Sequence, residues 1–169
     1  MSSLQYHIET AIMRHLGAVP KDEVVAACTD PKFVESFQQW HMNNSLCRNF
    51  CNKILMEKQY EPPVDMKDVN KAGKFHIPVQ EVGNEVTYKE VTKDQYTMFN
   101  ALNQKSMEMK YKLETMAKQI KKEHNLDFDP IEIATSANAL QKHEEKCLAK
   151  LNQQQGQQQT PTKSGPAIG

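Results

Sequence analysis

The sequence lacks a long apolar run and an excess of charge of either sign. Lys plus Arg and Asp plus Glu both number 21, so the formal net charge is zero. No run approaches the roughly 18 apolar residues of a transmembrane helix, so we expect no membrane span. Nucleic-acid binders neutralise phosphates with a broad basic field. Because that field is missing, we expect no nucleic-acid partner.

Glycine and recognisable catalytic motifs are also scarce. The six glycines leave little material for a phosphate-binding loop, and no nucleophile motif or paired-carboxylate signature is present. We therefore expect a non-enzymatic protein without a cofactor. Residues 1–6 form no basic segment ahead of an apolar core, and position 2 is Ser rather than the Gly that myristoylation needs. We expect a cytoplasmic protein with reduced cysteines, and this pattern is also compatible with a nuclear or a cilium- or cytoskeleton-associated one.

The first 58 residues carry helical patterns. Apolar side chains at four-residue steps predict a first helix that ends at Gly17, and Pro20 can open a short second one. Asp30 and Pro31 are suited to the cap and first turn of a helix over 31–58. This third helix carries an aromatic-rich stripe, which predicts that it is the central core helix: Phe33, Phe37, Trp40, Cys47, Cys51 and Ile54. The Asn43-Asn44-Ser45 step is its weak point and a candidate kink.

The pattern changes after residue 58. Residues 59–74 are polar, contain Pro62-Pro63 and read as a linker. Two short apolar-polar alternations then flank Gly83-Asn84 and predict a β-hairpin over 75–91, in which Pro78 limits the first strand to an edge. A lone hairpin is only marginally stable, so we expect it to lean on the helices.

The helix that begins at Thr92 has the most specific pattern. Thr92 and Gln95 fit a capping box, and Val91 can pack on Tyr96. Its apolar positions follow alternating steps of three and four over about three heptads, with Ser106 among them. The seam is either internal core or a coiled-coil interface with another chain or another copy. Its partner-binding candidates are Phe99, Leu102, Met109, Leu113, Met116 and Ile120.

The last predicted helix starts at Asp129-Pro130 and runs to residue 151. Residues 152–169 are Gln-rich, have little apolar content to bury, and are predicted to be disordered. We thus expect a mainly all-α fold: a small helical bundle with one long heptad-bearing helix, a small hairpin insertion and a disordered tail. Segments 1–58, 59–91 and 92–151 would form one domain over 1–151.

Two Cys/His pairs allow a metal-site alternative. Cys47 and Cys51 lie one helical turn apart, as do His143 and Cys147. If the pairs met, they would supply a Cys₃His zinc site. Both pairs, however, fall on or beside apolar stripes, where Cys behaves as a small hydrophobe, and core packing is the simpler interpretation.

The order of these motifs resembles BART-type domains. The resemblance covers roughly residues 4–150 and rests on an N-terminal helix, Asp30-Pro31-Lys32-Phe33 opening an aromatic helix, and 86–91 before a helix with Tyr96. It implies a helical bundle that binds Arf-like small GTPases, in a family with cilia-associated members. The chain departs from that pattern in a longer stretch between Phe50 and Thr87, in the Val91-to-Tyr96 spacing, and in a final helix without a Phe-rich face.

These observations favour an interaction module. The leading hypothesis is a helical adaptor or complex subunit that binds a protein partner, itself helical, or another copy of the chain, through apolar helix faces. The alternative is an effector of an Arf-like small GTPase, associated with cilia or microtubules. The second alternative is a small zinc-stabilised domain.

Overall fold

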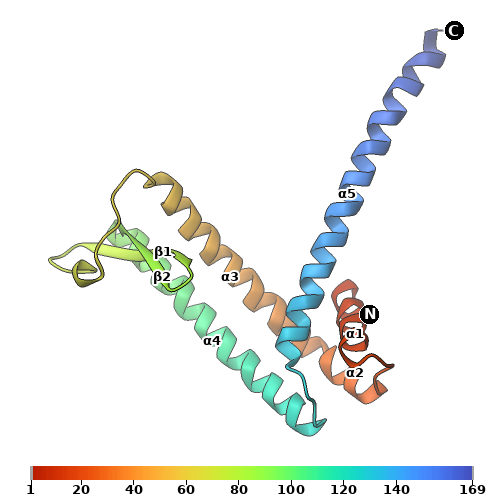
Figure 1. Ribbon diagram of the computed structural model, residues 1–169, viewed down its shortest axis with the longest axis horizontal. Helices are drawn as coiled ribbons and strands as arrows, with labels where there is room; N and C mark the ends of the chain where they lie inside the picture. Colours follow the sequence, from red (N-terminus) through yellow and green to blue (C-terminus); the bar gives the residue numbers. More distant parts are fainter. Residues whose placement is uncertain (1, 169) are drawn as a thin grey trace. The chain divides into compact units, whose positions relative to one another are not determined.

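The chain is mainly α-helical and carries a two-stranded hairpin, as the sequence predicts (Figure 1). The computed structural model describes residues 2–168, and side chains over residues 2–155. The elements in chain order are α1 (Ser3–Leu16), α2 (Asp22–Cys28), α3 (Pro31–Glu57), η1 (Met66–Asp68), β1 (Phe75–Val82), β2 (Glu85–Val91), α4 (Lys93–Glu123) and α5 (Pro130–Ile168).

The chain divides into two compact units, each assembled from segments distant in sequence. One unit contains Met1–Val34 and Met116–Gly169, and the other contains Glu35–Thr115. These boundaries differ from the segments read along the sequence, because α3 and α4 each contribute residues to both units.

In the first unit, α1 packs against α2 and α5. The face of α1 that carries Leu4, Ile8 and Ile12 is almost fully buried. On α5 the buried positions include the small residues Ala134 and Ala137, which let two helix backbones approach closely. This apolar packing is what holds the unit together.

Local capping sets the ends of these helices. The Ser2 side chain accepts from the Gln5 N–H and the Gln5 side chain accepts from the Ser2 N–H, a capping box that starts α1. Gly17 ends α1 with φ of 65°, a conformation that only glycine adopts at little cost. The second helix begins at Asp22 rather than at Pro20, and its acidic first turn complements the helix dipole.

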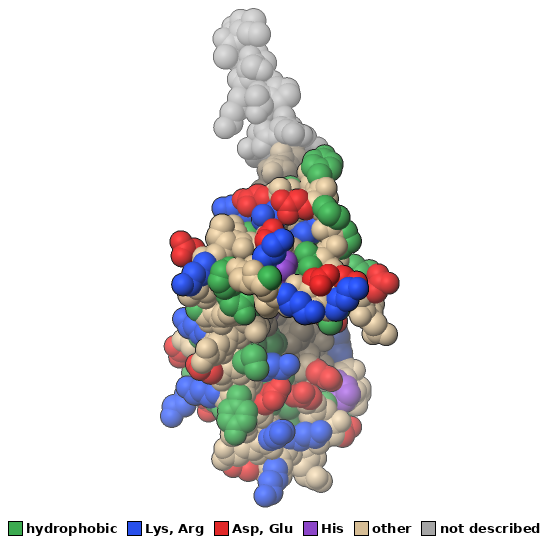
Figure 2. Space-filling model, turned by 90° about the vertical axis from the view of Figure 1, so that its left-hand side faces the viewer, with side chains coloured by type: hydrophobic (Ala, Val, Ile, Leu, Met, Phe, Trp, Pro, Cys, Tyr) green, Lys and Arg blue, Asp and Glu red, His purple; other side chains and the backbone are tan. Residues whose placement is uncertain are grey.

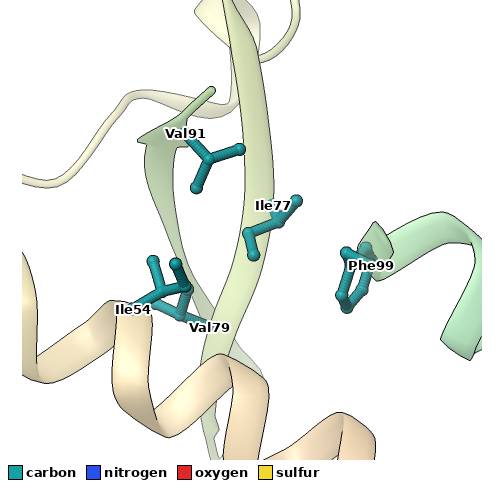
Figure 3. Close-up of a cluster of buried hydrophobic side chains, with 5 residues drawn as sticks. All are labelled: Ile54, Ile77, Val79, Val91 and Phe99. Carbon is teal, nitrogen blue, oxygen red and sulfur yellow. The ribbon is translucent and has the colours of Figure 1, made fainter. Parts of the chain in front are cut away.

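In the second unit the hairpin leans on both long helices. A buried cluster joins side chains of α3, both strands and α4 (Figure 3): Ile54, Ile77, Val79, Val91 and Phe99. The predicted capping box at the start of α4 is confirmed, with 3.1 Å from the Gln95 nitrogen to Thr92 Oγ1 and 3.0 Å from the Thr92 nitrogen to Gln95 Oε1. Tyr96 packs against the same cluster as Val91, as the sequence predicts.

The candidate kink at Asn43-Asn44-Ser45 is a polar layer within a continuous α3. Asn43 is only 4% exposed, and its side-chain nitrogen donates to the Leu102 carbonyl oxygen at 3.1 Å. The Ser106 hydroxyl donates to the Asn44 side-chain oxygen. The polar step in α3 and the polar position in the α4 seam therefore satisfy each other, which fixes the register of the two helices.

The hairpin has the predicted turn and one irregularity. Gly83 has φ of 62° between the strands, which a tight two-residue turn requires. The register pairs Phe75 with Val91 and shifts between Pro78 and Gln80, so β1 carries a bulge at that point. Pro78 stands just before the bulge on an edge strand, as the sequence predicts.

Part of the predicted disordered tail lies beyond the described side chains. Residues 152–155 continue α5 with exposed side chains, and the side chains from 156 on are outside the described range. None of the helices in the described part of the chain combines the length and apolar character that a bilayer-spanning segment requires.

Candidate functional site

The heptad seam of α4 is buried at two of its positions and half-buried at the others. Leu113 is completely buried and Phe99 is 9% exposed, whereas Leu102 and Met109 are half-buried. In the second unit the seam therefore supplies internal packing. Phe99 and Leu113 are therefore core side chains, whereas Leu102 and Met109 keep part of their surface exposed.

The last two seam positions lie in the first unit and line a groove of about 410 Å³. Met116 and Ile120 are half-buried and stand one helical turn apart. The residues that line this groove, called here the α2–α4 groove, are Ala27, Asp30, Lys32, Phe33, Met116, Gln119, Ile120 and Glu123. The seam thus ends at a groove that is lined by both apolar and polar side chains.

The junction between α2 and α3 positions one wall of the groove. The Thr29 hydroxyl donates to the Val25 carbonyl at 2.6 Å and closes α2. The Asp30 carboxylate accepts from the Lys32 N–H at 2.8 Å, as an N-cap does, and starts α3 immediately afterwards. This tight junction fixes Phe33, which is 1% exposed, as the floor of the α2–α4 groove.

Charged and polar side chains surround the apolar floor. Asp30, Lys32, Gln119 and Glu123 line the groove and are all exposed. An apolar floor with a few polar groups at its border is the usual composition of a binding pocket, and the volume falls within the roughly 300–1,000 Å³ of such sites. The chemistry suits apolar side chains presented by a polar partner segment.

The two Cys/His pairs do not gather as a metal site. In the described part of the chain, no group of three or more His, Cys, Asp and Glu side chains is arranged to hold a metal ion. Burial raises the pKa of the Cys51 thiol to about 11 and also raises that of Cys47, which disfavours the thiolate that binds metals. Cys147 is exposed on α5, with its sulfur 3.6 Å from His143 Nε2.

A second hollow, of about 520 Å³, lies between the 61–74 segment and the hairpin. Asn70 fixes this segment: its N–H donates to His76 Nδ1 at 2.9 Å and its side-chain oxygen accepts from the His76 N–H at 2.7 Å. Asn70 and Ala72 have positive φ. The sequence predicts only a linker over 59–74 and misses this ordered arrangement. Hydrogen bonds between an Asn and a His leave no periodic pattern in the sequence, so Gly73 is the only signal of a turn here.

One face of the molecule is visibly mixed in charge (Figure 2). Figure 2 shows acidic, basic and apolar side chains interspersed over the face that it presents. No protein-family model, characterised protein or solved structure shows significant similarity to this chain.

Proposed function

We propose that the chain is a protein-binding module whose α2–α4 groove accepts the apolar face of a partner helix. The observation that carries this proposal is that Met116 and Ile120, the last two positions of the seam, line a groove of about 410 Å³ and are only half-buried. Two apolar side chains one turn apart form the kind of surface into which an amphipathic helix lays its own anchors. The partner is therefore a helix with apolar residues at spacings of three and four.

The size of the groove limits its contribution to affinity. Two or three buried apolar anchors stabilise a complex by ~1.5–3 kcal/mol each, against an association cost of at least ~4 kcal/mol. The groove alone therefore supports a weak to moderate complex. It gives specificity through its shape, and a tight complex needs contacts elsewhere on the chain.

A matched pair of substitutions tests the groove. Met116→Glu places a charge in the groove, whereas Met107→Glu makes the same change at a side chain of α4 that is 64% exposed and outside it. In affinity capture with the full chain as bait, Met116→Glu and Ile120→Glu should each lose a protein that the wild type retains. Met107→Glu should still retain that protein. Capture that is equal for all three variants would sink the proposal, provided circular dichroism shows each variant folded.

The GTPase-effector alternative is separated by running that capture with GTPγS and with GDP. A small GTPase retained only with GTPγS, and lost with Met116→Glu, would assign the groove to an effector. Proteins retained equally with both nucleotides would assign it to a constitutive complex subunit. In either case the captured segment should gain helical circular dichroism on binding, because a helix is what the groove fits.

A further inference from the structure

The hairpin is a two-stranded sheet, so each strand has a second edge. In an antiparallel pair, backbone groups point alternately toward the partner strand and away from it. The contacts of β1 reveal which residues point away. The His76 N–H donates to the Asn70 side chain, and the Pro78 carbonyl accepts from the Cys51 thiol at 3.6 Å. His76 and Pro78 therefore direct their backbone groups away from β2.

Because β1 and β2 pair residue by residue, the same alternation of inward and outward backbone groups applies to β2. His76 is opposite Glu90 and Pro78 is opposite Tyr88, so Tyr88 and Glu90 also direct their N–H and C=O groups outward. Val86, two residues earlier on the same strand, follows the same alternation. The outer edge of β2 thus presents the backbone of Val86, Tyr88 and Glu90, called here the β2 edge.

The two edges of the hairpin differ in whether their outward backbone N–H and C=O groups have hydrogen-bond partners. The β1 edge is closed by Asn70, by Cys51 and by a proline that has no N–H to offer. Among the described residues, no hydrogen bond to the outward backbone groups of the β2 edge is recorded beyond the hairpin itself. An edge with free donors and acceptors is a template for one more strand.

The charge around the β2 edge selects the strand that would pair. Glu81, Glu85 and Glu90 are exposed on the hairpin. The lysine of the strands, Lys89, is 4% exposed, and its Nζ donates to the Glu61 carbonyl at 2.6 Å. Lys71 and Lys74 line the hollow beside Glu90, but the strands themselves carry three exposed glutamates and no exposed lysine. A second copy of the hairpin would bring two sets of carboxylates into one short sheet, which repels.

We propose that the β2 edge binds an extended, basic peptide segment of a partner protein by adding a third strand. Backbone hydrogen bonds to the β2 edge supply the pairing. Paired residues share a face, so Glu81 and Glu90 lie on the same face as Val86, and Glu85 lies on the other face with Val82. Lys or Arg side chains of the added strand face Glu81 and Glu90 beside Val86, which is 36% exposed, and its apolar side chains extend the opposite face, where Val82 is 66% exposed. This surface is separate from the α2–α4 groove, and it goes beyond the function proposed for that groove.

Amide hydrogen exchange on the full chain tests the strand addition. The probe is an eight-residue peptide of alternating Lys and Val, acetylated and amidated at its ends. When it occupies about nine-tenths of the sites, exchange of the Tyr88 and Glu90 amides should slow about tenfold, because only the free tenth exchanges. Thr87 and Lys89 already pair with β1, so the exchange of their amides should change little.

Two control peptides and two variants decide the outcome. An alternating Glu and Val peptide, and the basic peptide methylated on every backbone nitrogen, should protect neither amide. Tyr88→Pro removes one outward N–H without touching the β1 ladder and should lose the probe, whereas Tyr88→Thr keeps that N–H and should bind. Equal protection by the acidic peptide, protection by the methylated one, or unchanged binding to Tyr88→Pro would each overturn the proposal. So would unchanged Tyr88 and Glu90 exchange with saturating basic peptide.

Discussion

The contact between His7 and Glu144 makes the stability of the first unit depend on pH. His7 is 6% exposed, with Nδ1 2.6 Å from the Ser3 carbonyl oxygen and Nε2 2.8 Å from the Glu144 carboxylate. Both neighbours accept hydrogen bonds, so both bonds form only when both ring nitrogens carry a proton. This geometry favours the imidazolium, although the ring is buried between α1 and α5.

The pKa of His7 is raised above its ordinary value. The hydrogen bond to the Ser3 carbonyl contributes most and the one to Glu144 follows, while the charges of Glu144 and Glu145 add to the rise and burial opposes it. The raised folded-state pKa means that the stabilisation is complete below the unfolded value of about 6.5. It is lost as the pH rises through the higher folded-state pKa.

The magnitude follows from the hydrogen bond that deprotonation removes. A buried hydrogen bond to a charged group contributes ~1.5–3 kcal/mol. Because the Glu144 side chain is 65% exposed, solvent screening reduces this to ~1 kcal/mol. Urea unfolding of the wild type should therefore show ~1 kcal/mol more loss of stability between about pH 6 and pH 9 than unfolding of Glu144→Gln, which keeps an acceptor without the charge.

An NMR titration assigns the effect to His7 rather than to other histidines. His15→Gln is the control, since His15 is exposed at 3.6 Å from Asp127 and its loss should leave most of the pH dependence in place. A measured His7 pKa below about 6.5 would contradict the raised pKa. Equal losses of unfolding free energy with rising pH in the wild type and in Glu144→Gln would contradict the role of Glu144.

Three further predictions concern core packing, capping and thiol reactivity. Leu113→Ala should lower the free energy of unfolding by ~2–5 kcal/mol in urea, because a completely buried side chain leaves a cavity. Thr92→Ala should cost ~1 kcal/mol in the same assay by removing the cap of α4, with Thr97→Ala as an exposed comparison. At pH 8, a thiol reagent should modify exposed Cys147 first, because burial raises the pKa of Cys28 and of Cys51 to about 11.

Most of the secondary structure could be predicted because local chemistry determines it. The capping box of Thr92, the glycine at position 83 and the Asp30-Pro31 start are signals within a few residues, and each stands at an element boundary in the structure. The difference at the start of α2 is small. Pro20 suits a first helical turn, but the helix begins at Asp22, whose negative charge in the first turn stabilises the positive end of the helix dipole.

The sequence could not predict which seam positions lie in the core and which line the groove. Leu113 and Ile120 occupy equivalent heptad positions and have similar apolar side chains, yet only one of them is completely buried. What separates them is which distant segments cover the helix. The polar layer of Asn44 and Ser106 has the same origin: each residue looked like a local defect, and only their pairing across two helices explains both.

The central claim is that a partner contacts the open end of the seam. Site-specific photocrosslinking tests it most directly, with p-benzoylphenylalanine in place of Gln119 at the α2–α4 groove or in place of Met107 outside it. The account predicts a specific crosslinked protein from position 119 that is absent from position 107 and disappears when Ile120→Glu is added. Crosslinks from position 107 alone, or crosslinks from 119 that survive Ile120→Glu, would contradict it.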